Sequence, residues 1–201
     1  MRTCARRTIA RLANLGHAVG VNRGVARATL VVVATGLVTV GLLASSAFAT
    51  SKSSEQSLPT LSQQVFAAIN NFRTSHGLVA LRESKALDRS ALSHSLEMGA
   101  KSYFAHNSAD GQAFWLRIRR YYGAQGYSRW AVGENLLWDA PRVSAATALQ
   151  QWIQSPPHLR NLETARWRNV GVSAVTVANA GGVYGGHRVT IITTDFGARS
   201  R

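Results

Sequence analysis

The spacing of apolar residues changes about two thirds of the way along this chain, and that change limits the folds open to it. Between residues 61 and 152, apolar side chains recur every three or four positions, which is typical of helices with one buried face. Residues 170–175 and 188–196 instead alternate or are rich in β-branched side chains, and turn residues separate them. Helices first and a strand hairpin last predict an α+β fold in which helices cover an antiparallel sheet.

Local signals set the expected bounds of the helices. The sequence predicts a helix capped at Thr60 and stopped at Gly77, a second after Ser84, a third over residues 112–122, and a fourth capped by Ser144. Pro156 and Pro157 are expected to end the fourth helix, because proline lacks the amide hydrogen and clashes with the preceding turn. One more strand is expected around residues 133–138.

The first 49 residues are typical of an export signal. Their first 27 residues hold six arginines and no acidic residue, and an uncharged apolar run follows from Ala28 to Leu43. Ala47-Phe48-Ala49 then supplies the small residues after which a signal peptidase cleaves. The sequence therefore predicts a signal peptide over residues 1–49. The alternative is an uncleaved membrane anchor, since the 22 uncharged residues 28–49 are long enough to cross a bilayer.

Cleavage after Ala49 leaves 152 residues, enough for one domain with a substantial core. Residues 50–59 are polar and rich in serine, so we expect a flexible linker, then one domain over residues 60–197 and a short tail, 198–201. Cys4 is the only cysteine and lies in the leader. We therefore expect the exported domain to have no disulfide bond, cysteine nucleophile or thiolate metal ligand. We also expect it to be a monomer.

The charge of the exported part is much lower than that of the whole chain. The net charge is +14, but the leader carries six of the 23 basic residues and none of the nine acidic ones, so 17 basic and nine acidic residues remain, a net charge of +8. The arginines are scattered, and Arg117, Arg119 and Arg120 form the only tight cluster. We expect a dispersed, solvated positive surface that does not bind nucleic acid, with acidic envelope polymers or anionic lipids as suitable partners.

Three polar residues lie where predicted elements begin or end: His106, Glu134 and His158. Two imidazoles and a carboxylate suit a divalent ion such as Zn²⁺, with an open position for water. They equally suit acid–base chemistry in which the carboxylate fixes an imidazole tautomer. Their separations of 28 and 24 residues match no compact metal motif, so helix capping and core hydrogen bonding stay open as alternatives.

Other polar residues have simpler explanations. His94 lies within the second predicted helix, where a structural role is expected. Ser108 and Ser155 are conceivable nucleophiles, but neither stands in a G-x-S-x-G context. Hydrogen bonding in a turn or a cap is the simpler role for both serines.

Several stretches of the chain occur in the order and spacing of a known family. They are NNFRTSHGLVAL, YFAHNSADG, RIRRYYGAQGYSRWAVGENL, QQWIQSPPHLRNL, RWRNVGVSAV and ITTDFG. In these motifs the chain resembles the CAP superfamily, the SCP domain of cysteine-rich secretory, venom-allergen and pathogenesis-related proteins, in its bacterial form. The resemblance covers nearly all of residues 61–196.

The resemblance implies an α-β-α sandwich, with a central antiparallel sheet between helical layers. It also implies a cleft lined by two histidines and two glutamates, where some members bind a divalent metal such as zinc. By their place in the motifs, His106, Glu134 and His158 correspond to three of these residues. Ser155 stands where many members have the second glutamate, which leaves less negative charge to hold a cation. Asn107 and Asn135 adjoin the cleft residues.

The resemblance further implies a secreted protein, located outside the cell or in its envelope. The leading expectation is a binding or interaction domain for an extracellular ligand such as a lipid, a peptide or an acidic envelope polymer. A hydrolase such as a peptidase is the alternative, with Glu134 and His158 as catalytic residues and a metal-bound or histidine-activated water as the attacking group. A lipid or sterol carrier is a third hypothesis, because aromatic residues cluster between His106 and Glu134, although core packing also explains them.

Overall fold

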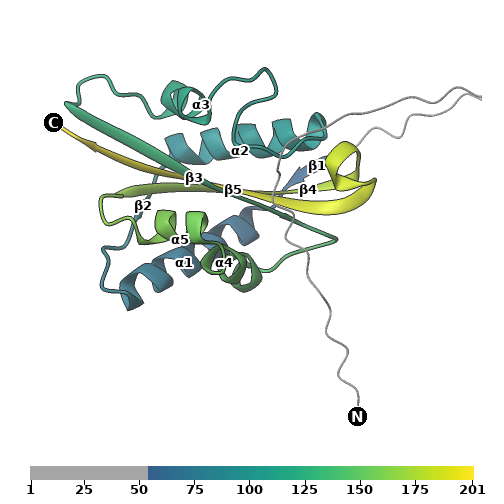
Figure 1. The fold of residues 1–201 in the computed structure, drawn as a ribbon, viewed down its shortest axis with the longest axis horizontal. Coiled ribbons are helices and arrows are strands. Elements are labelled where there is room, and N and C mark those ends of the chain that lie inside the picture. Colours follow the sequence, from purple (N-terminus) through teal and green to yellow (C-terminus); the bar gives the residue numbers. More distant parts are fainter. Residues whose placement is uncertain (1–53) are drawn as a thin grey trace, which may run out of the picture. The chain divides into compact units, whose positions relative to one another are not determined.

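The computed structural model describes residues 54–201, so the predicted signal peptide, residues 1–49, lies outside the described part. A sheet forms the middle layer, α2 and α3 cover one face, and α1, α4 and α5 cover the other (Figure 1). The elements are β1 (Glu55–Ser57), α1 (Pro59–Ser75), β2 (Arg82–Glu83), α2 (Lys85–Ala100), α3 (Phe114–Tyr121), β3 (Arg129–Asp139), α4 (Ala145–Ile153), α5 (Pro156–Glu163), β4 (Asn169–Ala180) and β5 (His187–Ser200). The expected α-β-α sandwich is confirmed.

Three long antiparallel strands make up most of the sheet. They lie in the order β4, β5, β3, with β3 at one edge. The short β1 and β2 both pair with β4 at the other edge, and only β2 does so in parallel. β4 and β5 form the predicted hairpin through the 3-10 turn Gly182–Tyr184. The register places Glu134 of β3 directly opposite Asp195 of β5, about halfway along the pairing of these two strands.

Three of the four prolines, Pro59, Pro156 and Pro157, lie in the first turn of a helix, and this corrects two of the sequence predictions. α1 begins at Pro59 and not after Thr60, and α5 begins at Pro156, which was expected only to end the preceding helix. Proline suits the first turn of a helix because the amide hydrogen it lacks has no partner there and its fixed φ is helical. The predicted starts of α2 after Ser84 and of α4 after Ser144 are confirmed.

The domain extends beyond both of its expected boundaries. β1 lies within the predicted linker 50–59 and pairs with residues 175–177 of β4. β5 runs through most of the predicted tail 198–201, and its last residues pair with the start of β3. Both segments carry mainly polar side chains, so apolar spacing does not reveal them. Main-chain pairing attaches them to the sheet.

Apolar layers on both faces hold the helices to the sheet. Trp152 belongs to the layer shared with α1 and α4, whereas Met98 of α2 packs on the opposite face with Val177. α2 lies so close to β4 that a Cβ atom at Gly171 would come within 2.1 Å of the Leu87 main chain. This close approach sets α2 directly above the polar middle of the sheet. Among residues 54–201, no helix is long and apolar enough to cross a membrane.

The two serine caps give a matched test of the fold. The Ser144 hydroxyl accepts a hydrogen bond from the Thr147 amide at the start of α4, whereas the Ser84 side chain makes no capping bond. We expect Ser144→Ala to lower the free energy of unfolding by about 1 kcal/mol. Ser84→Ala should cost clearly less, as measured by urea denaturation. Equal costs at the two positions would contradict the assigned cap.

Candidate functional site

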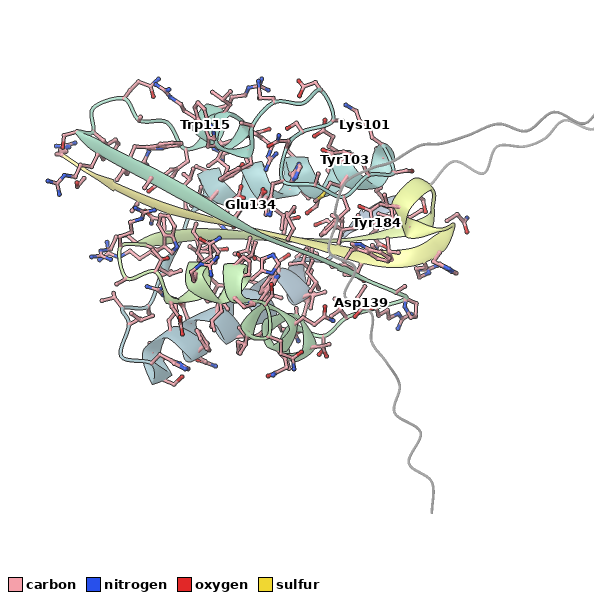
Figure 2. All side chains as sticks on the ribbon, viewed as in Figure 1. Lys101, Tyr103, Trp115, Glu134, Asp139 and Tyr184 are labelled. Atoms are coloured by element: carbon pink, nitrogen blue, oxygen red, sulfur yellow. The ribbon has the colours of Figure 1, made fainter. Side chains whose placement is uncertain are left out.

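His106 is held by a hydrogen bond to a buried carboxylate. Its ring nitrogen Nδ1 lies 2.8 Å from Oε1 of Glu134, which projects from the middle of β3 (Figure 2). The Glu134 side chain is fully buried, whereas 51% of the His106 side chain is exposed. A carboxylate can only accept this hydrogen bond, so a neutral His106 ring carries its proton on Nδ1. The second ring nitrogen, Nε2, is then an acceptor.

Arg117 of α3 ties the same carboxylate to the loop that carries His106. One nitrogen of its guanidinium pairs with Oε2 of Glu134, so that both oxygens of Glu134 are engaged. A second nitrogen, Nη1, donates to the main-chain oxygen of His106 at 3.0 Å and to the Ser108 hydroxyl at 3.2 Å, while the buried Nε has no hydrogen-bond partner among the described residues. The Arg117 side chain is only 5% exposed. The guanidinium therefore fixes the position of Glu134 and the path of the loop together.

A second carboxylate lies beneath the first. Asp195 faces Glu134 across β3 and β5, where opposite residues have Cβ atoms about 4.5–5.5 Å apart. Its side chain is fully buried and neither oxygen has a hydrogen-bond partner that meets normal geometry, although Ser90 of α2 lies nearby. Burial, and next the charge of Glu134, raises the pKa of Asp195 well above its ordinary value. The buried site therefore favours the protonated form of Asp195, which adds no second negative charge beside the Glu134–Arg117 pair.

His94 has the structural role expected for it. Its ring is buried in α2, and Nε2 lies 2.9 Å from the main-chain oxygen of Ala105. Burial is the largest of the effects that lower the pKa of His94, so the ring is neutral at pH 7. The hydrogen bond holds the residue just before His106, and His94 thus supports the loop from below.

His158 approaches the site from α5, on the opposite face of the sheet. Its main-chain oxygen accepts a hydrogen bond from the Asn135 side chain at 3.1 Å, and Asn161 bonds both Asn135 and the main chain of Glu134. The His158 ring is partly buried. Burial lowers its pKa, and the nearby charge of His106 lowers it further. This effect indicates that the two imidazoles interact electrostatically across the edge of β3, and their meeting in one cleft stays a prediction.

The other residues singled out in the sequence contribute less. Ser155 is the N-cap residue of α5, but its side chain makes no capping bond. Asn107 is exposed and makes no hydrogen bond to the described residues. Neither contacts the buried pair.

Two important residues, Arg117 and Asp195, were not proposed from the sequence. Arg117 lies on the inner face of α3, three residues after Phe114 and one before the buried Ile118, so helical spacing places it inside. Asp195 is a lone acid within the apolar and threonine-rich segment IITTDFG, where the surrounding strand is buried on both faces. A single acidic residue within an otherwise apolar and threonine-rich strand indicates a buried polar site.

The described residues do not form a three-ligand metal site. Among residues 54–201, no group of three or more His, Cys, Asp or Glu side chains comes together in a way that could hold a metal ion. The reason is that Glu134 uses one oxygen on His106 and the other on Arg117, whose charge already balances the carboxylate. His106 and His158 are left as two nitrogen donors. The zinc site remains a prediction, and no chemical step is derived from it.

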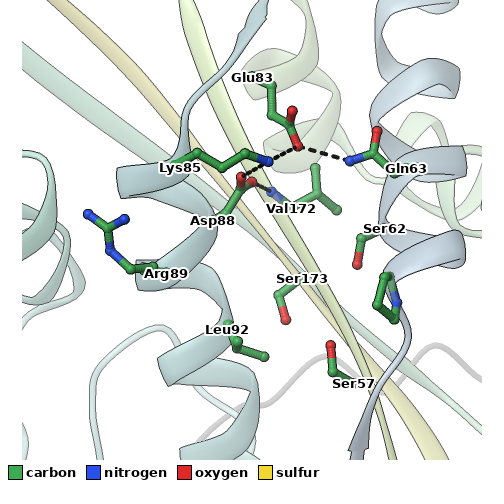
Figure 3. A pocket seen from close by; sticks show the side chains of 11 residues that line it. Ser57, Ser62, Gln63, Glu83, Lys85, Asp88, Arg89, Leu92, Val172 and Ser173 are labelled. Carbon is green, nitrogen blue, oxygen red and sulfur yellow. Dashed lines mark hydrogen bonds and ion pairs between the residues drawn. The ribbon is translucent and has the colours of Figure 1, made fainter.

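A separate pocket lies at the other edge of the sheet (Figure 3). Between β1 and β2 the edge of β4 has no strand beside it, and side chains replace the missing pairing. Asp88 accepts from the Val172 amide at 3.1 Å, and the Ser62 hydroxyl accepts from the Ala174 amide at 3.0 Å. Lys85 lies 3.4 Å from Asp88. The pocket contains none of the predicted site residues, and its polar groups serve the sheet edge.

Comparison with known proteins gives one family. A family model described as the cysteine-rich secretory protein family (CAP) matches residues 66–193. Among solved structures, an extracellular protein containing an SCP domain from Bacillus anthracis is 27% identical with a TM-score of 0.54; the match covers 70% of this chain and 41% of that protein. The chain thus spans less than half of the Bacillus protein.

A second structure shows likeness of fold alone. An outer surface protein from Borrelia burgdorferi is 15% identical with a TM-score of 0.59, and the match covers 73% of this chain and 100% of that one. Among curated proteins, none is significantly similar to this chain.

The buried ion pair can be tested by a double-mutant cycle. Arg117→Met leaves the Glu134 charge buried without a cation, which we expect to lower the free energy of unfolding by about 3–5 kcal/mol. In a Glu134→Gln background the same replacement should cost much less, because no carboxylate is left unpaired. Denaturant unfolding of the four proteins measures the coupling. An equal cost in both backgrounds would mean that Arg117 and Glu134 do not depend on each other.

The buried state of Asp195 predicts a particular pH dependence. Because its pKa is raised in the folded protein, the folded state binds more protons than the unfolded state above about pH 3.9. The stability that Asp195 contributes is therefore complete at low pH and is lost as the pH rises. Asn cannot ionise, so the free energy of unfolding of Asp195→Asn minus that of wild type should increase as the pH rises above about pH 4. A constant difference would contradict the raised pKa.

Proposed function

The chain belongs to the cysteine-rich secretory protein (CAP) family, and we propose that it acts outside the cytoplasm as a binding domain that engages its ligand through His106 and His158. Support for the location comes from the predicted signal peptide and from similar bacterial structures described as an extracellular and an outer surface protein. The 41% coverage of the Bacillus protein means that other parts of that protein have no counterpart in this chain. The function proposed here is therefore that of the domain.

The observation that carries the proposal is the fixed, half-exposed ring of His106. Glu134 holds one ring nitrogen at 2.8 Å, and Arg117 holds both that carboxylate and the main chain of His106. The ring has lost most of its freedom before any ligand arrives, which lowers the entropic cost of binding. Its remaining nitrogen, Nε2, offers an acceptor at a set position.

His158 provides the second binding group. Its lowered pKa keeps the ring neutral at pH 7, so it too has one donor and one acceptor nitrogen. A neutral imidazole at His158 and a carboxylate already balanced by Arg117 favour an uncharged ligand over an ion. Ligands that donate hydrogen bonds from hydroxyl or amide groups, as sugars and peptides do, fit this chemistry best.

A hydrolase is the second candidate, and one observation favours it. A histidine whose Nδ1 is held by a carboxylate can accept a proton from water at Nε2, as a general base does. Ser108, the hydroxyl nearest in sequence, accepts a hydrogen bond from Arg117 and so serves the loop. Water is therefore the nucleophile this site would use. This candidate would be favoured if wild type hydrolyses members of a peptide library and Glu134→Gln does not.

The binding proposal is tested with libraries of short peptides and soluble oligosaccharides. Binders are found by their effect on the imidazole nitrogen resonances of the ¹⁵N-labelled protein, and we expect His106 and His158 to shift together. His106→Ala and His158→Ala should each weaken binding by roughly tenfold or more, the loss of about one buried hydrogen bond. His187→Ala, at an exposed position outside the site, is the control.

Several results would count against the proposal. Unchanged affinity in both site variants would place the ligand elsewhere, and failure of both libraries to yield a binder would remove its chemical basis. Calorimetric titration with Zn²⁺ supplies the competing outcome. If Zn²⁺ binds tightly to wild type and not to the variant that lacks both histidines, the site is a metal site and the proposal is wrong.

A further inference from the structure

Arginines that are scattered in the sequence come together at one end of the sheet. The end of β5, the start of β3 and the loop before β4 meet there (Figure 1). Arg129 pairs with Ser200, the Arg168 amide donates to Gly197, and the Arg82 amide donates to the main chain of Arg168. We call this set the arginine end; its members are Arg82, Arg129, Arg166, Arg168, Arg199 and Arg201. All are exposed except Arg199, which is partly buried.

No carboxylate forms an ion pair with these arginines within the part of the chain that the structure describes, and Glu83, next to Arg82 in sequence, pairs with Lys85 instead. The ion pairs of residues 54–201 involve Lys85, His94, Lys101, His106 and Arg117, and none involves the arginine end. The segments 111–133, 164–169 and 196–201 contain no acidic residue at all. The expectation of a dispersed positive surface holds for exposed arginines elsewhere, such as Arg89, Arg142 and Arg188, and the arginine end is a local concentration within that surface.

Uncharged groups, by contrast, hold several of these guanidinium groups in place. Arg199 lies over the rings of Tyr122 and Tyr127, at 4.1 and 4.5 Å from their centroids, and donates to the main chain of Gly123 at 3.1 Å. Arg166 lies 4.7 Å from the centroid of Trp167. Stacking and carbonyl contacts orient a guanidinium without cancelling its charge. This end is thus cationic and partly preorganised.

A buried cation strengthens the positive potential from inside. Arg73 of α1 is fully buried, and its partners are the main-chain oxygens of Val79, Leu162 and Thr164. Burial lowers the pKa of Arg73, and the charge of Arg168 lowers it further. The two positive charges therefore repel each other. Mutual repulsion of this kind is relieved when an anionic partner binds.

We propose that the arginine end binds a linear polyanion whose repeating unit carries phosphate. The planar guanidinium fork matches phosphate oxygens, and several such groups at one end of a sheet can engage successive units of a chain. Arginines already lie over the rings of Tyr122, Tyr127 and Trp167, which disfavours stacking of these rings on nucleobases or their insertion into a lipid surface. A polyol phosphate polymer of the cell envelope has this chemistry. The proposal is independent of the ligand of His106 and His158.

The test compares two triple variants that remove the same charge from different places. Arg82→Gln/Arg129→Gln/Arg201→Gln changes side chains of the arginine end that make no hydrogen bond or ring contact to the described residues, so the fold should survive. The control variant replaces three exposed arginines elsewhere, Arg89, Arg142 and Arg188, by Gln. Binding of the purified protein to soluble poly(glycerol phosphate) is measured by calorimetry over a range of salt concentrations.

We expect wild type to bind the polymer with an affinity that falls steeply with salt, since each phosphate contact releases a counterion. The first variant should lose at least about tenfold in affinity, and the control variant less than about threefold. Absence of binding by wild type, or equal losses in the two variants, would overturn the proposal. Tighter binding at equal phosphate concentration to phosphatidylglycerol vesicles or to duplex DNA would also overturn it, in favour of a membrane or a nucleic acid.

Discussion

The buried ion pair between Arg117 and Glu134 is the interaction on which the site depends. Each partner would be costly to bury alone, and together they also hold the main chain of His106 and one of its ring nitrogens. The adjacent Asp195 has no cation of its own, and its raised pKa keeps a second negative charge out of this region. The Arg117 guanidinium thus neutralises the charge of Glu134 and holds the main chain of the His106 loop. Through Glu134 it also fixes the orientation of the His106 ring.

The rigid sheet explains how groups from both of its faces reach the same place. β3 is an edge strand, so the loop after α2 can bring His106 to it from one side and α5 can bring His158 from the other. The strand itself contributes Glu134 to one face and Asn135 to the opposite face. The same strand begins at Arg129, in the arginine end. Two candidate binding surfaces therefore share one scaffold element.

Apolar spacing and loop position were sufficient to predict the α+β class, most of the helices, and His106, Glu134 and His158 as candidates. They do not reveal Arg117 or Asp195, because whether a charged side chain can be buried depends on a partner far away in sequence. The gathering of Arg129, Arg168 and Arg199 depends on strand register, which sequence spacing alone does not set. Residues 55–57 likewise join the sheet through main-chain pairing, which the side-chain pattern of a polar segment does not predict.

The tautomer of His106 is the most direct test of this account. Two-dimensional ¹H–¹⁵N NMR spectra record the couplings between the carbon-bound protons of the ring and its two nitrogens. The pattern of these couplings distinguishes a neutral imidazole protonated at Nδ1 from one protonated at Nε2. If Glu134, balanced by Arg117, accepts the hydrogen bond from His106, the neutral ring will be protonated at Nδ1 in wild type. A neutral His106 protonated at Nε2 would contradict the account, because Nδ1 would then have no proton to donate to Glu134.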